Sequence, residues 1–146
     1  NGWHIYLHKQ IMGPCPGIDL ESARNLILLT LSLIKEHLIK SATDLSEGGL
    51  AVALVESIIR APEPVGAEIT LPERVRPDIE LFSEAQSRIL VSAEAENIAR
   101  IEKECTRLGF RAIRIGTTSS VEHLKVSGLI DISKNAMLHS IQHLPW

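Results

Sequence analysis

The sequence predicts an α+β domain in which helices cover a mixed β-sheet. Long stretches with apolar residues at every third or fourth position indicate amphipathic helices, and short alternating or β-branched runs indicate strands. Helices and strands follow one another without strict alternation, which favours a mixed sheet over a purely parallel one. A length of 146 residues suits one compact domain with a core of ordinary size.

Residues 20–38 form the first predicted helix. Their apolar side chains recur at intervals of three and four, and Asp19 is a suitable N-cap. Residues 39–43 are expected to form a short strand. A Gly-Gly pair then leads into residues 50–59, which are apolar on nearly every side and therefore predict a buried helix.

The middle of the chain carries clear stop and start signals. Pro62 ends the second helix, and residues 67–71 alternate like a strand. Pro77 opens a short helical segment that we expect to end near Ser83.

The second half predicts a strand, helix, strand unit. Residues 88–93 are expected to be a strand, 95–108 a helix that ends at Gly109, and 110–115 the next strand. Beyond it we expect three further elements: a polar turn at 117–120, an extended segment at 124–132, and a last helix capped by Ser133.

These elements are expected to share one hydrophobic core. Their periodicity places seven aliphatic residues in it: Leu31, Ile34, Leu54, Ile58, Val91, Ile101 and Ile115.

Composition argues against several classes of function. The formal net charge is -3 and the 15 Lys and Arg residues are scattered, so no nucleic-acid partner is expected. The longest apolar stretch, residues 26–34, is much shorter than the roughly 20 residues of a membrane-spanning helix. Cys15 and Cys105 are far apart and have no companion motif, which favours a reducing cytoplasm over a disulfide framework.

Neither the histidines nor the cysteines predict a metal or catalytic centre. His4 with His8, and His139 with His143, have helical i,i+4 spacing, but two histidines are too few ligands for a zinc site. Cys105 lies on the predicted core face of its helix, so it is not expected to act as a nucleophile. We therefore expect no metal ligands and no catalytic residues in this chain.

A glycine-containing loop is the most informative polar segment. Asp44, Ser46, Gly48 and Gly49 lie between a predicted strand and the start of a buried helix. A helix N-terminus with a nearby hydroxyl favours an anion such as phosphate. Alternatively, Asp44 or Ser46 caps the helix and the glycines allow close packing, which is the commoner arrangement.

A second polar segment precedes the strand at 88–93. Glu84, Gln86 and Arg88 are suited to hydrogen-bonding a polar ligand at a strand mouth, where α/β sheets often place their sites. The alternative is a solvated turn with a local pair between Glu84 and Arg88.

Three segments taken together resemble one family. Residues 13–21 read GPCPGIDLE, residues 44–54 read DLSEGGLAVAL, and residues 81–88 read LFSEAQSR. In order and spacing they resemble the synthetase subunit of phosphoribosylformylglycinamidine synthase. The extended segment at 126–130, followed by a helix and a final Leu-Pro-Trp, is similar to the C-terminus of that family.

The resemblance implies a domain organisation. In this superfamily, which includes aminoimidazole ribonucleotide synthetase, an ATP-binding domain precedes a C-terminal α/β domain, and the synthase contains the pair twice. Residues 1–18 would then be the tail of an ATP-binding domain with its linker, and residues 19–146 the second α/β domain. The first residue is Asn rather than Met, which leads us to expect that the chain begins within a longer protein.

The resemblance also implies an activity. The family is an ATP- and magnesium-dependent ligase of purine biosynthesis that converts formylglycinamide ribonucleotide to its amidine. Its partners are a glutaminase subunit that supplies ammonia and a small accessory subunit. The nucleotide and metal residues belong to the other domains, so the isolated chain is expected to bind no cofactor tightly and to be inactive.

The site residues carry over only in part. Ser83, Glu84 and Gln86 are counterparts of a substrate-associated Ser-Glu-x-Gln stretch in the first α/β domain. Many relatives have His before the Asp of the Gly-Gly loop, whereas this chain has Thr43, so an acid/base or phosphate role there is not expected.

Two other functions stay open at the level of sequence. The domain could belong to a related hydrogenase-maturation or thiamine-phosphate enzyme, which the sequence upstream of Asn1 would decide. It could also be a stand-alone small-ligand binding module, which a start codon directly before Asn1 would favour.

Overall fold

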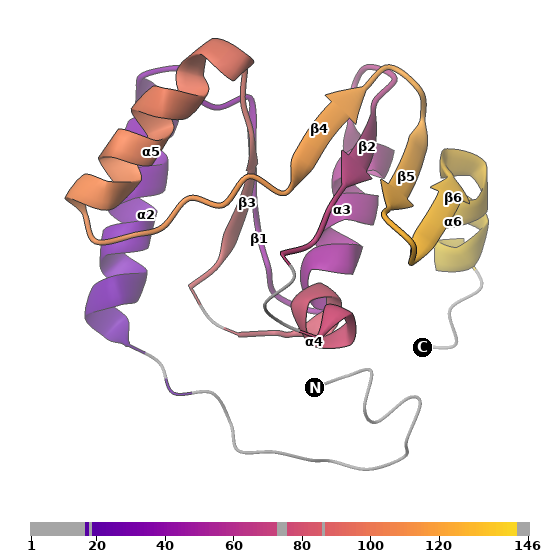
Figure 1. Cartoon of the computed structure of the whole chain (residues 1–146), viewed down its shortest axis with the longest axis horizontal. Helices are drawn as coiled ribbons and strands as arrows, with labels where there is room; N and C mark the ends of the chain where they lie inside the picture. The colour runs from indigo at the N-terminus through magenta and orange to yellow at the C-terminus, as the bar shows by residue number, and fades with distance from the viewer. Residues whose placement is uncertain (1–16, 18, 73–75, 86, 143–146) are drawn as a thin grey trace. The chain divides into compact units, whose positions relative to one another are not determined.

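The computed structural model describes residues 17, 19–72, 76–85 and 87–142 (Figure 1). They form two compact units. The first unit comprises the described residues of Asn1–Glu47 and Glu84–Arg114, and the second comprises those of Gly48–Ser83 and Ile115–Trp146. The predicted tail at 1–18 lies outside the described residues except for Gly17, as does the Leu-Pro-Trp end.

The first unit contains two long helices and a two-stranded sheet. Its elements are α2 (Leu20–Lys35), β1 (Ser41–Asp44), β3 (Ile89–Ser92), a short 3-10 helix at Ala95–Asn97, and α5 (Ile98–Arg107). β1 and β3 are antiparallel. α2 and α5 lie side by side (Figure 1), and Leu29 and Leu33 of α2 form a core with Ile101 and Cys105 of α5. Leu38, which follows α2, belongs to the same core.

Local signals fix both ends of α2. The Asp19 carboxylate accepts hydrogen bonds from the N–H groups of Glu21 and Ser22, at 3.1 and 3.3 Å, which confirms the predicted N-cap. The helix ends at Lys35, three residues earlier than predicted, because His37 turns into the left-handed region with a φ of 54°. The Leu38 N–H then donates to the Leu33 carbonyl, which completes a Schellman-type stop.

The second unit is built on a four-stranded mixed sheet. Its elements are α3 (Gly49–Arg60), β2 (Gly66–Ile69), α4 (Pro77–Phe82), β4 (Gly116–Ser119), β5 (His123–Val126), β6 (Ile130–Ser133) and α6 (Lys134–Gln142). The strand order is β4-β2-β5-β6. β2 runs antiparallel to β4 and parallel to β5, so the predicted mixed sheet covered by helices is confirmed.

The core of the second unit lies between this sheet and two helices. Along β5, Leu124 and Val126 are fully buried while Lys125 is exposed. α3 contacts β2 and β5, and α6 contacts both β6 and α3, so both helices pack on the same face of the sheet (Figure 1). Met137 of α6 is the third fully buried large side chain among the described residues. The opposite face of the sheet is polar.

The structure corrects two predicted strands. Residues 110–115 contain no strand, and β4 instead occupies the segment predicted as a polar turn at 117–120. Threonines suit an exposed edge strand, so low hydrophobicity there did not indicate a turn. The segment at 124–132 is a hairpin of β5 and β6 that turns at Gly128, whose φ is 72°.

The structure also corrects the predicted core. Leu54, Ile58 and Ile101 are buried as predicted, and Ile115 is half-buried. Three of the seven predicted core residues are exposed: Leu31 at 56%, Ile34 at 49% and Val91 at 36%. The reason in α2 is that a different apolar stripe, through Leu29 and Leu33, faces α5. In addition, the chain forms two small units, whereas one shared core was predicted.

Among the described helices, none is long and apolar enough to cross a membrane.

Candidate functional site

The seven predicted ligand residues do not belong to one unit. The first unit contains Asp44, Ser46, Glu84 and Arg88, the second contains Gly48 and Gly49, and Gln86 lies outside the described residues.

The first unit brings the polar ends of β1 and β3 together. Asp44 ends β1 and lies opposite Ile89 at the start of β3. The Leu45 N–H donates to the Arg88 carbonyl at 3.1 Å, which extends the ladder by one bond. Asp44 and Ser46 are exposed, and Arg88 is half-buried beside them. A carboxylate, a hydroxyl and a guanidinium therefore come from neighbouring chain segments, although Asp44 and Arg88 are far apart in sequence.

The backbone beside Arg88 is unusual. Ser87 has a φ of 63°, in the left-handed region that residues other than glycine seldom adopt. Such a conformation costs free energy and is maintained only where the surrounding structure requires it. The bend at Ser87 lies directly before Arg88 and the start of β3.

In the second unit, conformation and packing account for the glycine pair. Gly48, with a φ of 75°, is the N-cap of α3 and has no side chain with which to cap the helix. Gly49 has a φ of 63°, and a Cβ there would lie 2.7 Å from the Ser83 carbonyl oxygen and 2.8 Å from that of Leu81. Only glycine allows the start of α3 to approach the end of α4 this closely.

The alternative to ligand binding at this loop had two parts, a side-chain cap on the helix and close packing at the glycines. The predicted cap by Asp44 or Ser46 is wrong, because the N-cap of α3 is Gly48. The close-packing role of the glycines is confirmed by the contacts that a Cβ at either position would make. A ligand-binding role for the loop stays a prediction.

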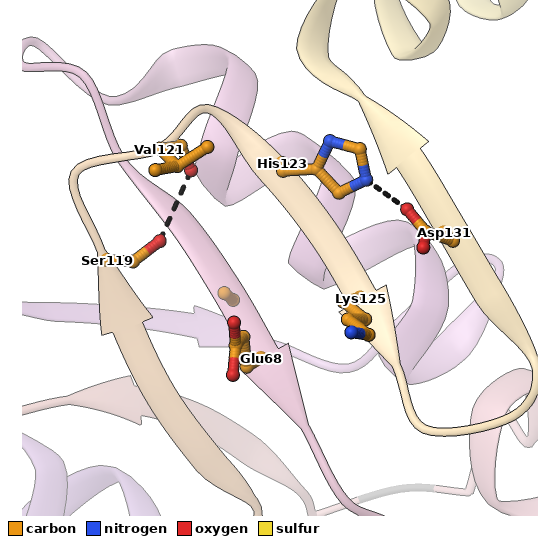
Figure 2. Close-up of a pocket in the computed structure, with 7 residues that line it drawn as sticks. Glu68, Ser119, Val121, His123, Lys125 and Asp131 are labelled. Atoms are coloured by element: carbon orange, nitrogen blue, oxygen red, sulfur yellow. Dashed lines mark hydrogen bonds and ion pairs between the residues drawn. The ribbon is translucent and has the colours of Figure 1, made fainter.

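Sequence reasoning missed a polar hollow on the outer face of the four-stranded sheet. It has a volume of about 310 Å³ and is lined by Ala67, Glu68, Ser119, Val121, His123, Lys125 and Asp131 (Figure 2). These residues come from all four strands and the β4–β5 loop, so no local motif reveals them. The alternation of polar and apolar residues in the sequence His-Leu-Lys-Val was the one available signal.

Charges alternate across this hollow. The strand register places Lys125 beside Glu68 on one side and opposite Asp131 on the other. His123 is paired with Asp131, as the dashed line in Figure 2 shows. Because Lys125 has a carboxylate neighbour on each adjacent strand, its charge is compensated, and the face suits contact with water better than capture of a strongly charged ligand.

The chemistry of the remaining groups is modest. Cys105 is buried as predicted, and burial raises the pKa of its thiol, which disfavours the nucleophilic thiolate. Within the described ranges, no three or more His, Cys, Asp or Glu side chains gather in a way that could hold a metal ion. His4, His8, His143 and Cys15 lie outside those ranges.

Comparison with known families decides the affiliation. The family model described as "AIR synthase related protein, C-terminal domain" matches residues 13–128. The chain belongs to this family. Among curated proteins, the chain is similar to the phosphoribosylformylglycinamidine synthase subunit PurL of Caldanaerobacter subterraneus subsp. tengcongensis, with 48% identity over 93 residues that cover 64% of this chain and 12% of that protein.

A second relative extends the match. The phosphoribosylformylglycinamidine synthase subunit PurL of Aquifex aeolicus is 33% identical over 121 residues, covering 83% of this chain and 16% of that protein. The chain therefore spans only 12 to 16% of the length of these two curated relatives.

Solved structures share the fold of this AIR synthase related domain. Thermotoga maritima PurL complexed with FGAR has a TM-score of 0.73 at 21% identity, covering 82% of this chain and 21% of that one. The same protein complexed with ATP has a TM-score of 0.69 at 21% identity, with coverages of 78% and 21%. The PurLQS structure from Thermotoga maritima has a TM-score of 0.73 at 18% identity, with coverages of 92% and 24%.

Proposed function

We propose that this chain is the C-terminal α/β domain of a phosphoribosylformylglycinamidine synthase. The whole protein would be an ATP-dependent C–N ligase of purine biosynthesis that converts formylglycinamide ribonucleotide to formylglycinamidine ribonucleotide. The observation that carries this proposal is the 48% identity to the PurL subunit of Caldanaerobacter subterraneus, within a family match that extends over residues 13–128.

In this proposal the chain contributes structure rather than the chemical step. It spans a small part of its relatives, so ATP and magnesium would be held mainly by the remaining domains of the same polypeptide. A Thermotoga maritima PurL complexed with ATP supports nucleotide use by the whole protein. The isolated chain is expected to hold no cofactor tightly and to have no synthetase activity.

The partners follow from the same assignment. The PurLQS structure, whose fold this chain shares over 92% of its length, supports association of the whole protein with further subunits. We assign these as a glutaminase that supplies ammonia and a small accessory subunit, in the cytoplasm.

Within the first unit, we assign a weak contact with a phosphate-bearing ligand to Ser46 and Arg88. A hydroxyl and a guanidinium are good phosphate donors. Asp44 lies two residues before Ser46 and Glu84 four residues before Arg88, and two carboxylates oppose an anion unless a metal ion or another domain compensates. We therefore expect weak binding by the isolated chain. Gly48 and Gly49 are needed for packing and are not required as ligands.

Steady-state assays test the main proposal. The full-length polypeptide and the isolated chain are each supplied with formylglycinamide ribonucleotide, ATP, magnesium and ammonia, and the amidine product is quantified. We expect product from the full-length polypeptide and none from the chain. The assignment would be overturned if a folded full-length polypeptide formed no amidine product but hydrolysed ATP with another substrate.

A separate titration tests the ligand contact. Amide NMR shifts of the isolated chain are followed on addition of ATP, ADP and a ribonucleotide monophosphate, with Arg88→Gln as the variant and Arg114→Gln as the control. We expect small saturable shifts near Ser46 that Arg88→Gln abolishes. Shifts confined to other segments would show that the ligand binds elsewhere.

A further inference from the structure

Helix α2 is apolar on two opposite sides. Leu29 and Leu33 face the core of the first unit. The other side carries an outer stripe of exposed side chains: Leu20 at 78%, Ile27 at 58%, Leu31 at 56% and Ile34 at 49%, with Leu28 beside it at 49%. A contiguous exposed apolar stripe on a helix commonly marks an interaction surface.

The outer stripe has the spacing of a coiled-coil seam. Leu20, Ile27 and Ile34 recur every seven residues, and Leu31 lies between the last two on the same side. Arg24 occupies the remaining seam position, where its apolar stem can lie along the stripe while its charge stays in water. This polar interruption makes a weak association more suitable than a permanent one.

Charges beside the stripe select an orientation. Glu21, Leu28 and Lys35 also recur every seven residues, which places them along one edge of the outer stripe. Glu21 lies in the first turn and Lys35 in the last turn of α2. Within the described part of the chain, neither side chain forms a salt bridge.

An antiparallel pair of these helices satisfies both charges. Equivalent edges of antiparallel helices face each other, so Glu21 of one copy would lie beside Lys35 of the other, and the same pair would form again at the opposite end. Leu28 would meet its own counterpart on the two-fold axis. In a parallel pair this edge would instead face the opposite edge of the partner helix, so Glu21 and Lys35 of the two copies would not pair with each other.

We propose that the outer stripe of α2 binds a second copy of this chain, with the two helices antiparallel and the two-fold axis near Leu28. Five exposed aliphatic side chains on each copy can bury on the order of 1,000 Å² in total, which is at the lower limit of specific interfaces. The expected dimer is accordingly weak, with a Kd on the order of micromolar.

Charge exchange tests the orientation. Sedimentation velocity is measured over about a hundredfold range of concentration for the unmodified chain, Glu21→Lys, Lys35→Glu and the double variant, each checked for folding by circular dichroism. Each single change creates two like-charge pairs and should weaken dimerisation by about tenfold, whereas the double change restores both pairs and the affinity. A chain that stays monomeric throughout, or a double variant as weak as the singles, would overturn the proposal.

Cross-linking tests the position of the axis. In a Cys15→Ser background, Leu28→Cys should form a disulfide-linked dimer under mild oxidation, whereas the matched control Val52→Cys, at an exposed position of the second unit, should not. The same variants are oxidised in the full-length polypeptide. If Leu28→Cys is protected there, another domain covers the stripe and the second-copy proposal is wrong.

Discussion

Helices α2 and α3 are both rich in aliphatic residues, yet their surroundings differ. α3 contacts α4, α6 and two strands of its sheet, and Leu50, Leu54 and Ile58 are buried. Within the described residues, α2 packs mainly against α5, and the outer stripe of α2 stays exposed. The comparison teaches that apolar content predicts a helix, whereas the number of neighbouring elements decides how much of it is buried.

The largest contrast is expected between the two sides of α2 itself. Leu29→Ala removes a side chain that is 3% exposed and leaves a cavity, which should lower the free energy of unfolding by about 3 kcal/mol. Leu31→Ala changes a side chain that is 56% exposed and should alter it by less than about 0.5 kcal/mol. Urea unfolding at low protein concentration measures both, and equal losses would contradict the assignment of the two sides.

The next effect concerns how α3 is enclosed. Gly49→Ala places a Cβ against two carbonyl oxygens of the α4 end and should cost about 2 kcal/mol beyond the strain of a positive φ. Gly109→Ala is the matched control, since its φ is 77° but no atom lies within 4 Å of the new Cβ, so only about 1 kcal/mol is expected. Similar losses for the two variants would remove the close-packing explanation of Gly49.

A smaller effect is expected at the start of α2. Asp19→Ala removes the side-chain cap and should lower the free energy of unfolding by about 1 kcal/mol, whereas Asp19→Asn should retain most of it. Thermal unfolding followed by circular dichroism gives both values. A loss as large for Asn as for Ala would indicate that charge, and not the cap hydrogen bond, stabilises this end.

The smallest effect lies on the surface of α4, which packs against α3. The hydrogen bond from Arg76 holds the pKa of Asp78 below its ordinary value of 3.8. A carboxylate whose pKa is lower in the folded state than in the unfolded state stabilises the folded protein at pH values above its unfolded-state pKa. This stabilisation is lost as the pH falls through the folded-state pKa. NMR titration should show a midpoint below 3.8 that Arg76→Gln raises; an unchanged midpoint would exclude Arg76 as the cause.

Signals contained within one segment predicted much of the fold. The Asp19 cap, the buried α3, the proline-initiated α4 and the Ser133 cap all depend on a few consecutive residues. Ser133 indeed accepts a hydrogen bond from the Ala136 N–H at 3.4 Å. The edge strand β4 was missed because its threonines are polar, and its place in the sheet comes from pairing with β2.

Features that depend on register were beyond the sequence alone. Asp131 reaches His123 only because β5 and β6 form a hairpin, and Asp44 lies near Arg88 only because β1 pairs with β3. The two sides of α2 illustrate the same limit. Leu29 and Leu31 both belong to helical stripes of correct spacing, and the position of α5 decides which stripe is buried.

Removal of this chain from the full-length polypeptide tests the proposed function most directly. Formation of formylglycinamidine ribonucleotide from formylglycinamide ribonucleotide, ATP and ammonia is measured for the full-length polypeptide and for a version that lacks residues 13–146 of this chain. We predict turnover by the first and none by the second, even though the second still folds. Equal turnover by both would contradict a required role for this domain in the synthase.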